Sequence, residues 1–138
     1  MHRIWMLIIF TLMSSVISAA SQSREGSAVF FISPKDGQVV KNPVRLSFGL
    51  SGMDLVEAGI NRPFSGHHHL LINVNQLPDM NLPIPSDNQH IHFGKGQDSG
   101  VLNLNPGQYT LQLLFADYLH IPHDKPLISK KITVKVVE

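Results

Sequence analysis

The sequence contains no cysteine, and this absence removes several classes of protein at once. With no Cys among 138 residues, the chain can form no disulfide, no thiolate metal site and no cysteine nucleophile. A lipoprotein is excluded as well, because no cysteine is available for lipid attachment. The stability of the domain must therefore come from packing, or from packing together with a bound ligand.

Charge is also scarce, and the two signs are balanced. Charged residues make up 15% of the chain, with eleven Lys and Arg against ten Asp and Glu. If Arg3 is removed with the N-terminal segment, ten of each sign remain. No basic patch interleaved with aromatic residues is present. We therefore expect neither nucleic acid nor an anionic membrane to be a partner.

The chain has no apolar run long enough to cross a membrane. Residues 4–13 are apolar except for Thr11, whereas about 20 residues are needed to span ~30 Å of hydrocarbon. His2 and Arg3 give this segment a basic start, and residues 18–20 (Ser-Ala-Ala) give it a small-residue end. This pattern predicts a secretory signal peptide over residues 1–20. We expect a periplasmic or secreted protein with no membrane insertion after cleavage.

Helical periodicity is missing too, while short alternating runs are frequent. Gly and Pro turns separate seven strand-like segments, which cover residues 28–32, 44–50, 67–74, 89–93, 101–104, 108–116 and 127–137. Such a pattern predicts an all-β fold, and we expect an antiparallel immunoglobulin-like β-sandwich of about seven or eight short strands. Residues 21–27 are predicted to be a flexible leader, and residues 28–138 a single domain.

One tyrosine favours the immunoglobulin-like form of the sandwich. Tyr109 follows the turn at Pro106-Gly107 and begins an alternating segment. Immunoglobulin-like sandwiches place a tyrosine at such a corner, where its hydroxyl bonds to nearby backbone. The alternative is that Tyr109 is an ordinary strand aromatic.

Three consecutive histidines begin the predicted strand at residues 67–74. Side chains alternate between the two faces of a strand, so His68 shares the apolar face of Leu70 and Ile72. We expect His68 to be a neutral, hydrogen-bonded core residue. His67 and His69 lie on the other, more polar face, ~6.5 to 7 Å apart along the strand, and can converge on one metal ion.

Two further histidine clusters are present, so that seven histidines lie after residue 20. His90 and His92 have the same alternate spacing, and His120 and His123 lie in a predicted loop. Imidazole sets of this kind suit Zn(II) or Cu(II), whereas Cu(I) favours thioether ligands. We predict a metal-binding domain for metal carriage, buffering or sensing, with ligands drawn from His67, His69, His90, His92, His120 and His123.

Two alternatives to metal binding stay open. In the first, the domain is a structural or interaction module of the cell envelope with an unknown protein partner, and its histidines form a hydrogen-bonded network that holds loops. In the second, it is a metal-dependent enzyme with Asp117 or Asp124 as base. No His-Glu-x-x-His segment and no nucleophile elbow around Ser65 is present, so we do not expect an enzyme.

The same histidine segments carry a resemblance to a known family. The segments GHHHLLINV, NQHIHFGKGQ and LNLNPGQYTLQLLFADYLHIPH resemble domain of unknown function family 4399 (DUF4399), which comprises short secreted bacterial proteins. The likeness extends over about residues 29–136. It implies a periplasmic, sandwich-like domain and no particular reaction, so the chemistry still rests on the histidines.

Overall fold

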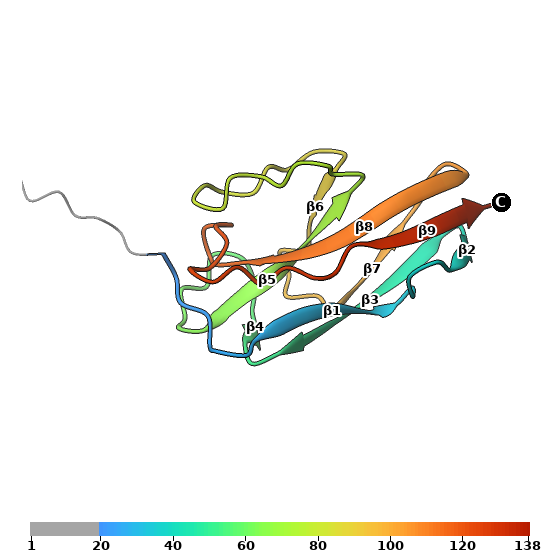
Figure 1. The fold of residues 1–138 in the computed structure, drawn as a ribbon. Helices are drawn as coiled ribbons and strands as arrows, with labels where there is room; N and C mark the ends of the chain where they lie inside the picture. The colour runs from blue at the N-terminus through green and yellow to red at the C-terminus, as the bar shows by residue number, and fades with distance from the viewer. Residues whose placement is uncertain (1–19) are drawn as a thin grey trace, which may run out of the picture.

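The chain folds into two β-sheets around a shared core. The structure, a computed structural model, describes residues 20–138, so that the predicted signal peptide lies outside the described residues apart from Ala20. The described chain forms nine strands (Figure 1), which are β1 (Ala28–Ser33), β2 (Val39–Lys41), β3 (Val44–Ser51), β4 (Asp54–Leu55), β5 (Ser65–Ile72), β6 (His90–His92), β7 (Ser99–Leu102), β8 (Gly107–Ala116) and β9 (Ile132–Val137). Over residues 20–138, no helix is long and apolar enough to cross a membrane. The all-β prediction is confirmed.

The two sheets differ in size and in strand direction. The smaller sheet has the order β1-β3-β7 and is antiparallel throughout. The larger sheet has the order β2-β9-β8-β5-β4, with β6 also paired to β5, and it curls into a half-barrel. Its pairs β2–β9 and β4–β5 are parallel. The prediction of a purely antiparallel sandwich is therefore wrong, and these pairings do not establish an immunoglobulin-like fold.

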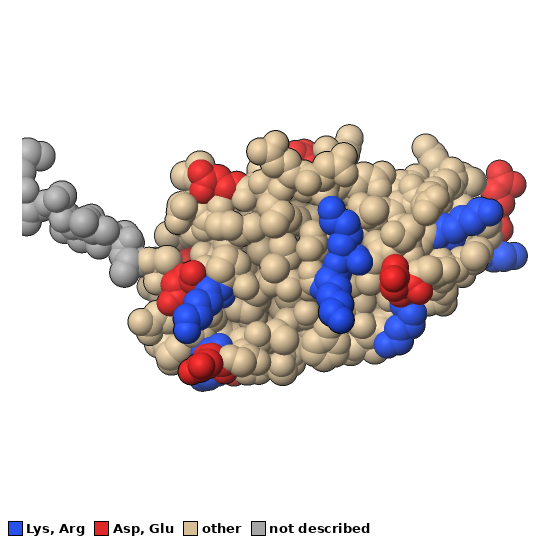
Figure 2. Space-filling model, in the orientation of Figure 1, with Lys and Arg blue, Asp and Glu red and all other residues tan. Residues whose placement is uncertain are grey.

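The surface carries few charges and shows no dominant sign. Figure 2 shows a face that is mostly uncharged, with acidic and basic side chains on it and one short basic stripe near its centre. This appearance agrees with the scarce and balanced charge of the sequence.

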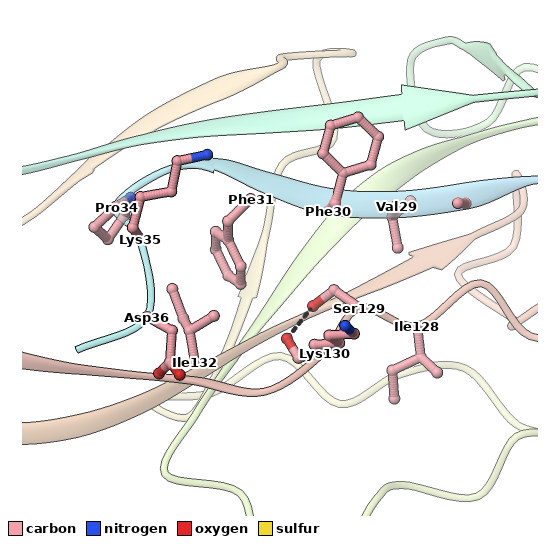
Figure 3. Close-up of a pocket in the computed structure, with 11 residues that line it drawn as sticks. Val29, Phe30, Phe31, Pro34, Lys35, Asp36, Ile128, Ser129, Lys130 and Ile132 are labelled. Carbon is pink, nitrogen blue, oxygen red and sulfur yellow. Dashed lines mark hydrogen bonds between the residues drawn. The ribbon is translucent and has the colours of Figure 1, made fainter. Parts of the chain in front are cut away.

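Alternation along the strands fills the space between the sheets. In β1, Val29 and Phe31 are buried while Phe30 and Ile32 are about half exposed. Figure 3 shows Phe30 on the opposite side of β1 from Val29 and Phe31. The same alternation in the other long strands completes the core, whose buried members from β3, β5, β8 and β9 are Val44, Leu46, Phe48, Leu70, Ile72, Leu111, Leu113, Phe115, Ile132, Val134 and Val136.

Tyr109 makes the bond that its position predicts. Its hydroxyl donates a hydrogen bond to the backbone oxygen of Asn105 at 2.7 Å. The bond closes the turn that leads into β8, and the register of β8 against β9 continues from this point.

Strand β5 is buried on both faces, which the sequence did not indicate. All eight of its residues are buried, whereas we expected the face of His67 and His69 to be the more polar one. A second apolar cluster, formed by Leu71, Val74, Ile84, Leu114 and Ala116, covers part of that face. The chain between β5 and β6 supplies Ile84, whose backbone nitrogen donates to the backbone oxygen of His120. Loops on both sides of the strand therefore enclose the face that carries two histidines.

The predicted leader makes specific contacts with the domain. The Ser21 hydroxyl donates to Asp117, and the backbone nitrogen of Ser23 donates to Asp124. The guanidinium of Arg24 donates to the backbone oxygen of Gly52 and lies 4.7 Å from the centre of the Phe64 ring. Residues 21–24 are thus attached to the loop that follows β8 and to the end of β3.

Candidate metal centre

Four of the six predicted ligands meet in one place. The imidazole rings of His67, His69, His92 and His120 lie against one another, with every pair of ring centres between 4.6 and 5.8 Å apart. We call these four residues the histidine cluster. Two of them come from β5, one from β6 and one from the loop after β8. Three separate parts of the chain therefore converge on a single group of imidazoles.

Three members of the cluster each direct a ring nitrogen towards the same position. One ring nitrogen from each of His67, His92 and His120 lies within 4.8 Å of the others. Two imidazole nitrogens on one tetrahedral zinc ion are roughly 3.3 Å apart, since each Zn–N bond is about 2.0–2.1 Å. The Nε2 atoms of His92 and His120 are already 3.1 Å apart. These three ring nitrogens are therefore close enough together that they could hold one metal ion.

Strand pairing brings His92 to the triplet. In the β5–β6 register, His92 lies directly opposite His69, and Ile91 lies opposite Leu70. Ile91 packs against the main core, so His92 faces the other side of the sheet, where His67 and His69 also point. Gly94 allows the ring to lie there, because a Cβ atom at residue 94 would overlap the His92 imidazole.

A tight turn after β8 brings His120 into the cluster. Asp117 is buried, and one of its carboxylate oxygens accepts hydrogen bonds from the backbone nitrogens of Leu119 and Ile121. The other oxygen accepts from Ser21. His120 adopts a left-handed backbone with φ 66°, which costs roughly 1–2 kcal/mol for a residue with a Cβ atom. Backbone strain of this kind accumulates at functional sites.

His67 is the member whose polar atoms lack partners. Its side chain is fully buried, and neither ring nitrogen has a hydrogen-bond partner among the described residues. A buried polar atom without a partner costs about 1–3 kcal/mol. Burial, and to a smaller extent the adjacent His92 and His120, lower the pKa of His67 to about 4, against an opposing effect of Asp117. The ring is therefore neutral at pH 7, which is the form that binds metal.

The other strand histidines in the cluster are also neutral at pH 7. Burial, together with His67, His92 and His120, lowers the pKa of His69 to about 2. The pKa of His92 is lowered by partial burial first and by His120 second. These shifts follow from crowding imidazoles together, because a proton on one ring disfavours a proton on the next.

His68 lies on the opposite face of β5, as alternation predicts. Its ring packs against Phe48 and Phe115, with ring centres 5.1 and 5.2 Å away. Burial lowers its pKa to about 4, against a smaller opposing effect of Asp98. The core position is confirmed. The expected hydrogen bond is not present, because neither ring nitrogen of His68 has a partner in residues 20–138.

Two predicted ligands are not brought to the cluster. The His90 ring donates from Nδ1 to Asp87 at 2.7 Å, within the turn that precedes β6. His123 is buried, with Nε2 donating to the backbone oxygen of Ser65 at 2.9 Å and its ring stacked on Phe115. Both histidines fix loops to the sheet. Asp124, one of the two bases considered, accepts hydrogen bonds from Ser23 and Lys125.

The groove in Figure 3 shares no lining residue with the histidine cluster. It has a volume of about 420 Å³ and runs between β1 and the segment before β9, where Val29, Phe31 and Ile132 line it. No histidine belongs to this lining. This groove therefore offers no imidazole ligand.

Some residues of the site were not predicted from the sequence. Gly94 leaves room for the His92 ring, Asp117 holds the turn of His120, and the segment 83–86 covers the cluster. Asp117 is two residues before Leu119, which is the spacing at which an aspartate side chain accepts a backbone hydrogen bond in a turn. No such local signal exists for segment 83–86.

The fold and the site together define an all-β domain with a partly enclosed cluster of imidazoles between its strands and loops. The chain belongs to the family described as Domain of unknown function (DUF4399), which it matches over residues 46–137. This range contains all four members of the histidine cluster and confirms the resemblance predicted from the sequence. No curated protein matches the chain, and no solved structure matches it either.

Proposed function

We propose that this domain binds one divalent transition-metal ion, Zn(II) or Cu(II), through His67, His92 and His120. The observation that carries the proposal is the environment of His67. A fully buried imidazole with two unpartnered nitrogens faces two other imidazoles whose ligand atoms lie within 4.8 Å. Neutral imidazoles in such a group suit borderline metals better than Mg²⁺ or Ca²⁺, which prefer oxygen ligands.

The role of the metal follows from the expected location of the domain. With the signal peptide predicted for residues 1–20, the domain acts in the periplasm or outside the cell, where it carries, buffers or senses the ion. The exposure of two ligands favours an exchangeable ion over a permanently buried one, because His92 is exposed and His120 is half-buried. An ion at this position is accessible from the surface.

Metal content and site variants test this proposal. Untagged protein loaded with Zn(II) and dialysed should retain one ion per chain, measured by mass spectrometry. His92→Ala should lose that ion, because it removes one of three ligands. His90→Ala is the matched control, since His90 lies in the same short strand but bonds to Asp87, and it should retain one ion. Equal metal content in both variants would contradict the proposal.

The position of the His92 ring can be tested without removing a ligand. Gly94→Ala places a methyl group where the ring lies, and the exposed ring should swing outward. We expect metal affinity to fall by about 10–100-fold, the usual range for residues that orient a ligand, with little change in the free energy of unfolding. Lys95→Ala, an exposed neighbour, is the control. An unchanged dissociation constant in Gly94→Ala would show that metal binding does not depend on the observed position of the His92 ring.

The alternative function is a module of the cell envelope whose histidines only hold loops. The 3.1 Å contact between His92 and His120 favours it, because one ring can donate to the other. It leaves the two nitrogens of His67 and Nδ1 of His69 without partners among the described residues. Buried polar networks stabilise a fold when every member is satisfied, so the metal site accounts for more of the geometry.

We also propose that the fold is a variant of the immunoglobulin-like sandwich. This proposal is supported by the Tyr109 bond to Asn105 and by the main core, which lies between the two sheets. The parallel edge pairs are departures from that pattern.

A further inference from the structure

A small cavity opens directly beside the histidine cluster. It has a volume of about 170 Å³ and lies between the rings of His69, His92 and His120 on one side and residues 83–86 on the other. A molecule of liquid water occupies about 30 Å³, so the cavity has room for only a few waters or one small ion. A drug-sized ligand does not fit, since such ligands occupy pockets of about 300 Å³ or more.

His69 borders this cavity without joining the converging triad. The group of ligand atoms that lie within 4.8 Å of one another consists of His67, His92 and His120. His69 is 1% exposed, and its Nδ1 has no hydrogen-bond partner in the part of the chain that the structure describes. The His69 ring therefore forms part of the cavity wall.

The charge of the metal site determines which kind of molecule is favoured in the cavity. Three neutral imidazoles around a divalent ion leave a net charge of +2 at the centre. Asp117, the buried carboxylate nearby, already accepts hydrogen bonds from Ser21, Leu119 and Ile121. No carboxylate belongs to the converging group in residues 20–138. A small anion in the cavity would therefore gain both a bond to the metal and charge compensation in a site of low polarity.

We infer that the metal has a fourth, exchangeable coordination position in this cavity, which takes water or a small monovalent anion beside His69. This inference rests on the proposed metal site and deepens it. Zinc sites with three protein ligands keep such an open position, whereas structural sites have four protein ligands. The lining supports access for a small ion, because Pro83, Pro85 and Ser86 are exposed and Ile84 alone is buried.

Azide titration of the Cu(II)-loaded full chain tests the inference. Azide should replace water on the metal and produce a saturable azide-to-copper charge-transfer band. Ser86→Trp introduces a large side chain at the rim of the cavity and should weaken azide binding at least tenfold, with one Cu(II) per chain retained. Asn88→Trp is the matched control, because Asn88 is exposed in the same segment but does not line the cavity, and its azide affinity should equal that of the wild type.

The outcomes separate this inference from the metal proposal itself. If the chain retains no Cu(II), the metal site is wrong. If Cu(II) is retained but azide produces no band, or if Ser86→Trp and Asn88→Trp bind azide equally, the open position in this cavity is wrong. Loss of metal in His69→Ala together with no azide band in the wild type would show that His69 is a fourth protein ligand and would overturn the inference.

Discussion

Acidification should unfold the metal-free domain between about pH 6 and pH 4, with uptake of about three protons per chain. Burial holds the pKa of His67 and His68 at about 4 and that of His69 at about 2, whereas an unfolded histidine has a pKa of ~6.5. Above pH 6.5 both states are neutral and stability is complete. Below it the unfolded state gains protons that the folded state cannot, so stability falls as pH decreases towards the folded pKa values.

The expected effect is large compared with the stability of a domain. Each proton contributes about 1.4 kcal/mol per pH unit, so three histidines give a slope of about 4 kcal/mol per pH unit. Domains of this size are stable by about 5–15 kcal/mol, which two pH units at this slope would largely remove. Urea unfolding in EDTA at several pH values measures the slope directly.

A single core substitution provides the control for acid unfolding. His68→Leu removes one of the three titrating groups and replaces two unpartnered nitrogens with apolar atoms. The slope should decrease to about two protons, and the acid midpoint should move to lower pH. A slope below one proton in the wild type, or an unchanged midpoint in His68→Leu, would mean that the triplet is not buried in neutral form.

The alternation of strand β5 shows how far the sequence determines the fold. His68, Leu70 and Ile72 face the main core, as their spacing predicts. The same spacing places Val74 on that face, since the predicted strand extends to residue 74, but Val74 joins the second apolar cluster instead. The reason is Asn73, whose φ of 53° ends the strand and turns the chain. Asparagine tolerates this conformation, but it does so in many places, so the residue type alone could not locate the break.

The two edge strands show what alternation cannot reveal. Strands β2 and β4 have three and two residues, which is too short for any period to be visible. Each lies parallel to a partner and is fixed by a few contacts at the edge of the larger sheet. The strand predicted over residues 127–137 also begins later, at Ile132, because the Ser129 hydroxyl replaces a backbone acceptor for Leu113.

The histidine cluster was only half predictable. Alternate spacing placed His67 and His69 on one face, and the same spacing made His90 and His92 equivalent. Only the register of β6 against β5 distinguishes them, because it sets His92 opposite His69 and sets His90 opposite Leu71, where its ring bonds to Asp87. Likewise, His120 and His123 share one loop, but the tight turn at Asp117 directs His120 towards the cluster. Register and loop closure depend on contacts that are distant in sequence.

The structure also changes the expected pH dependence of metal binding. Histidines with the ordinary pKa of ~6.5 would release metal as pH falls from about 7.5 to 5.5. Burial holds the pKa of His67 at about 4, and burial with the adjacent His120 lowers that of His92. At His67, protons therefore compete with metal only as the pH approaches 4. We expect the affinity to be lost at lower pH than for ligands of ordinary pKa, and to disappear by about pH 4.

Zn(II) or Cu(II) should accordingly raise the melting temperature of the wild type by roughly 10 °C at 100 times the dissociation constant, since binding to the folded state alone contributes about 2.7 kcal/mol there. Differential scanning fluorimetry at pH 7.5 and 5.5 measures the shift, which should persist at pH 5.5 because His67 stays neutral there. His92→Ala/His120→Gly should abolish it and stay folded, because both side chains lie at the accessible side of the cluster and glycine tolerates the backbone of residue 120. His90→Ala should keep the full shift. An equal shift in all three proteins would identify adventitious surface binding, and the histidine cluster would then be a network that holds the loops around β5.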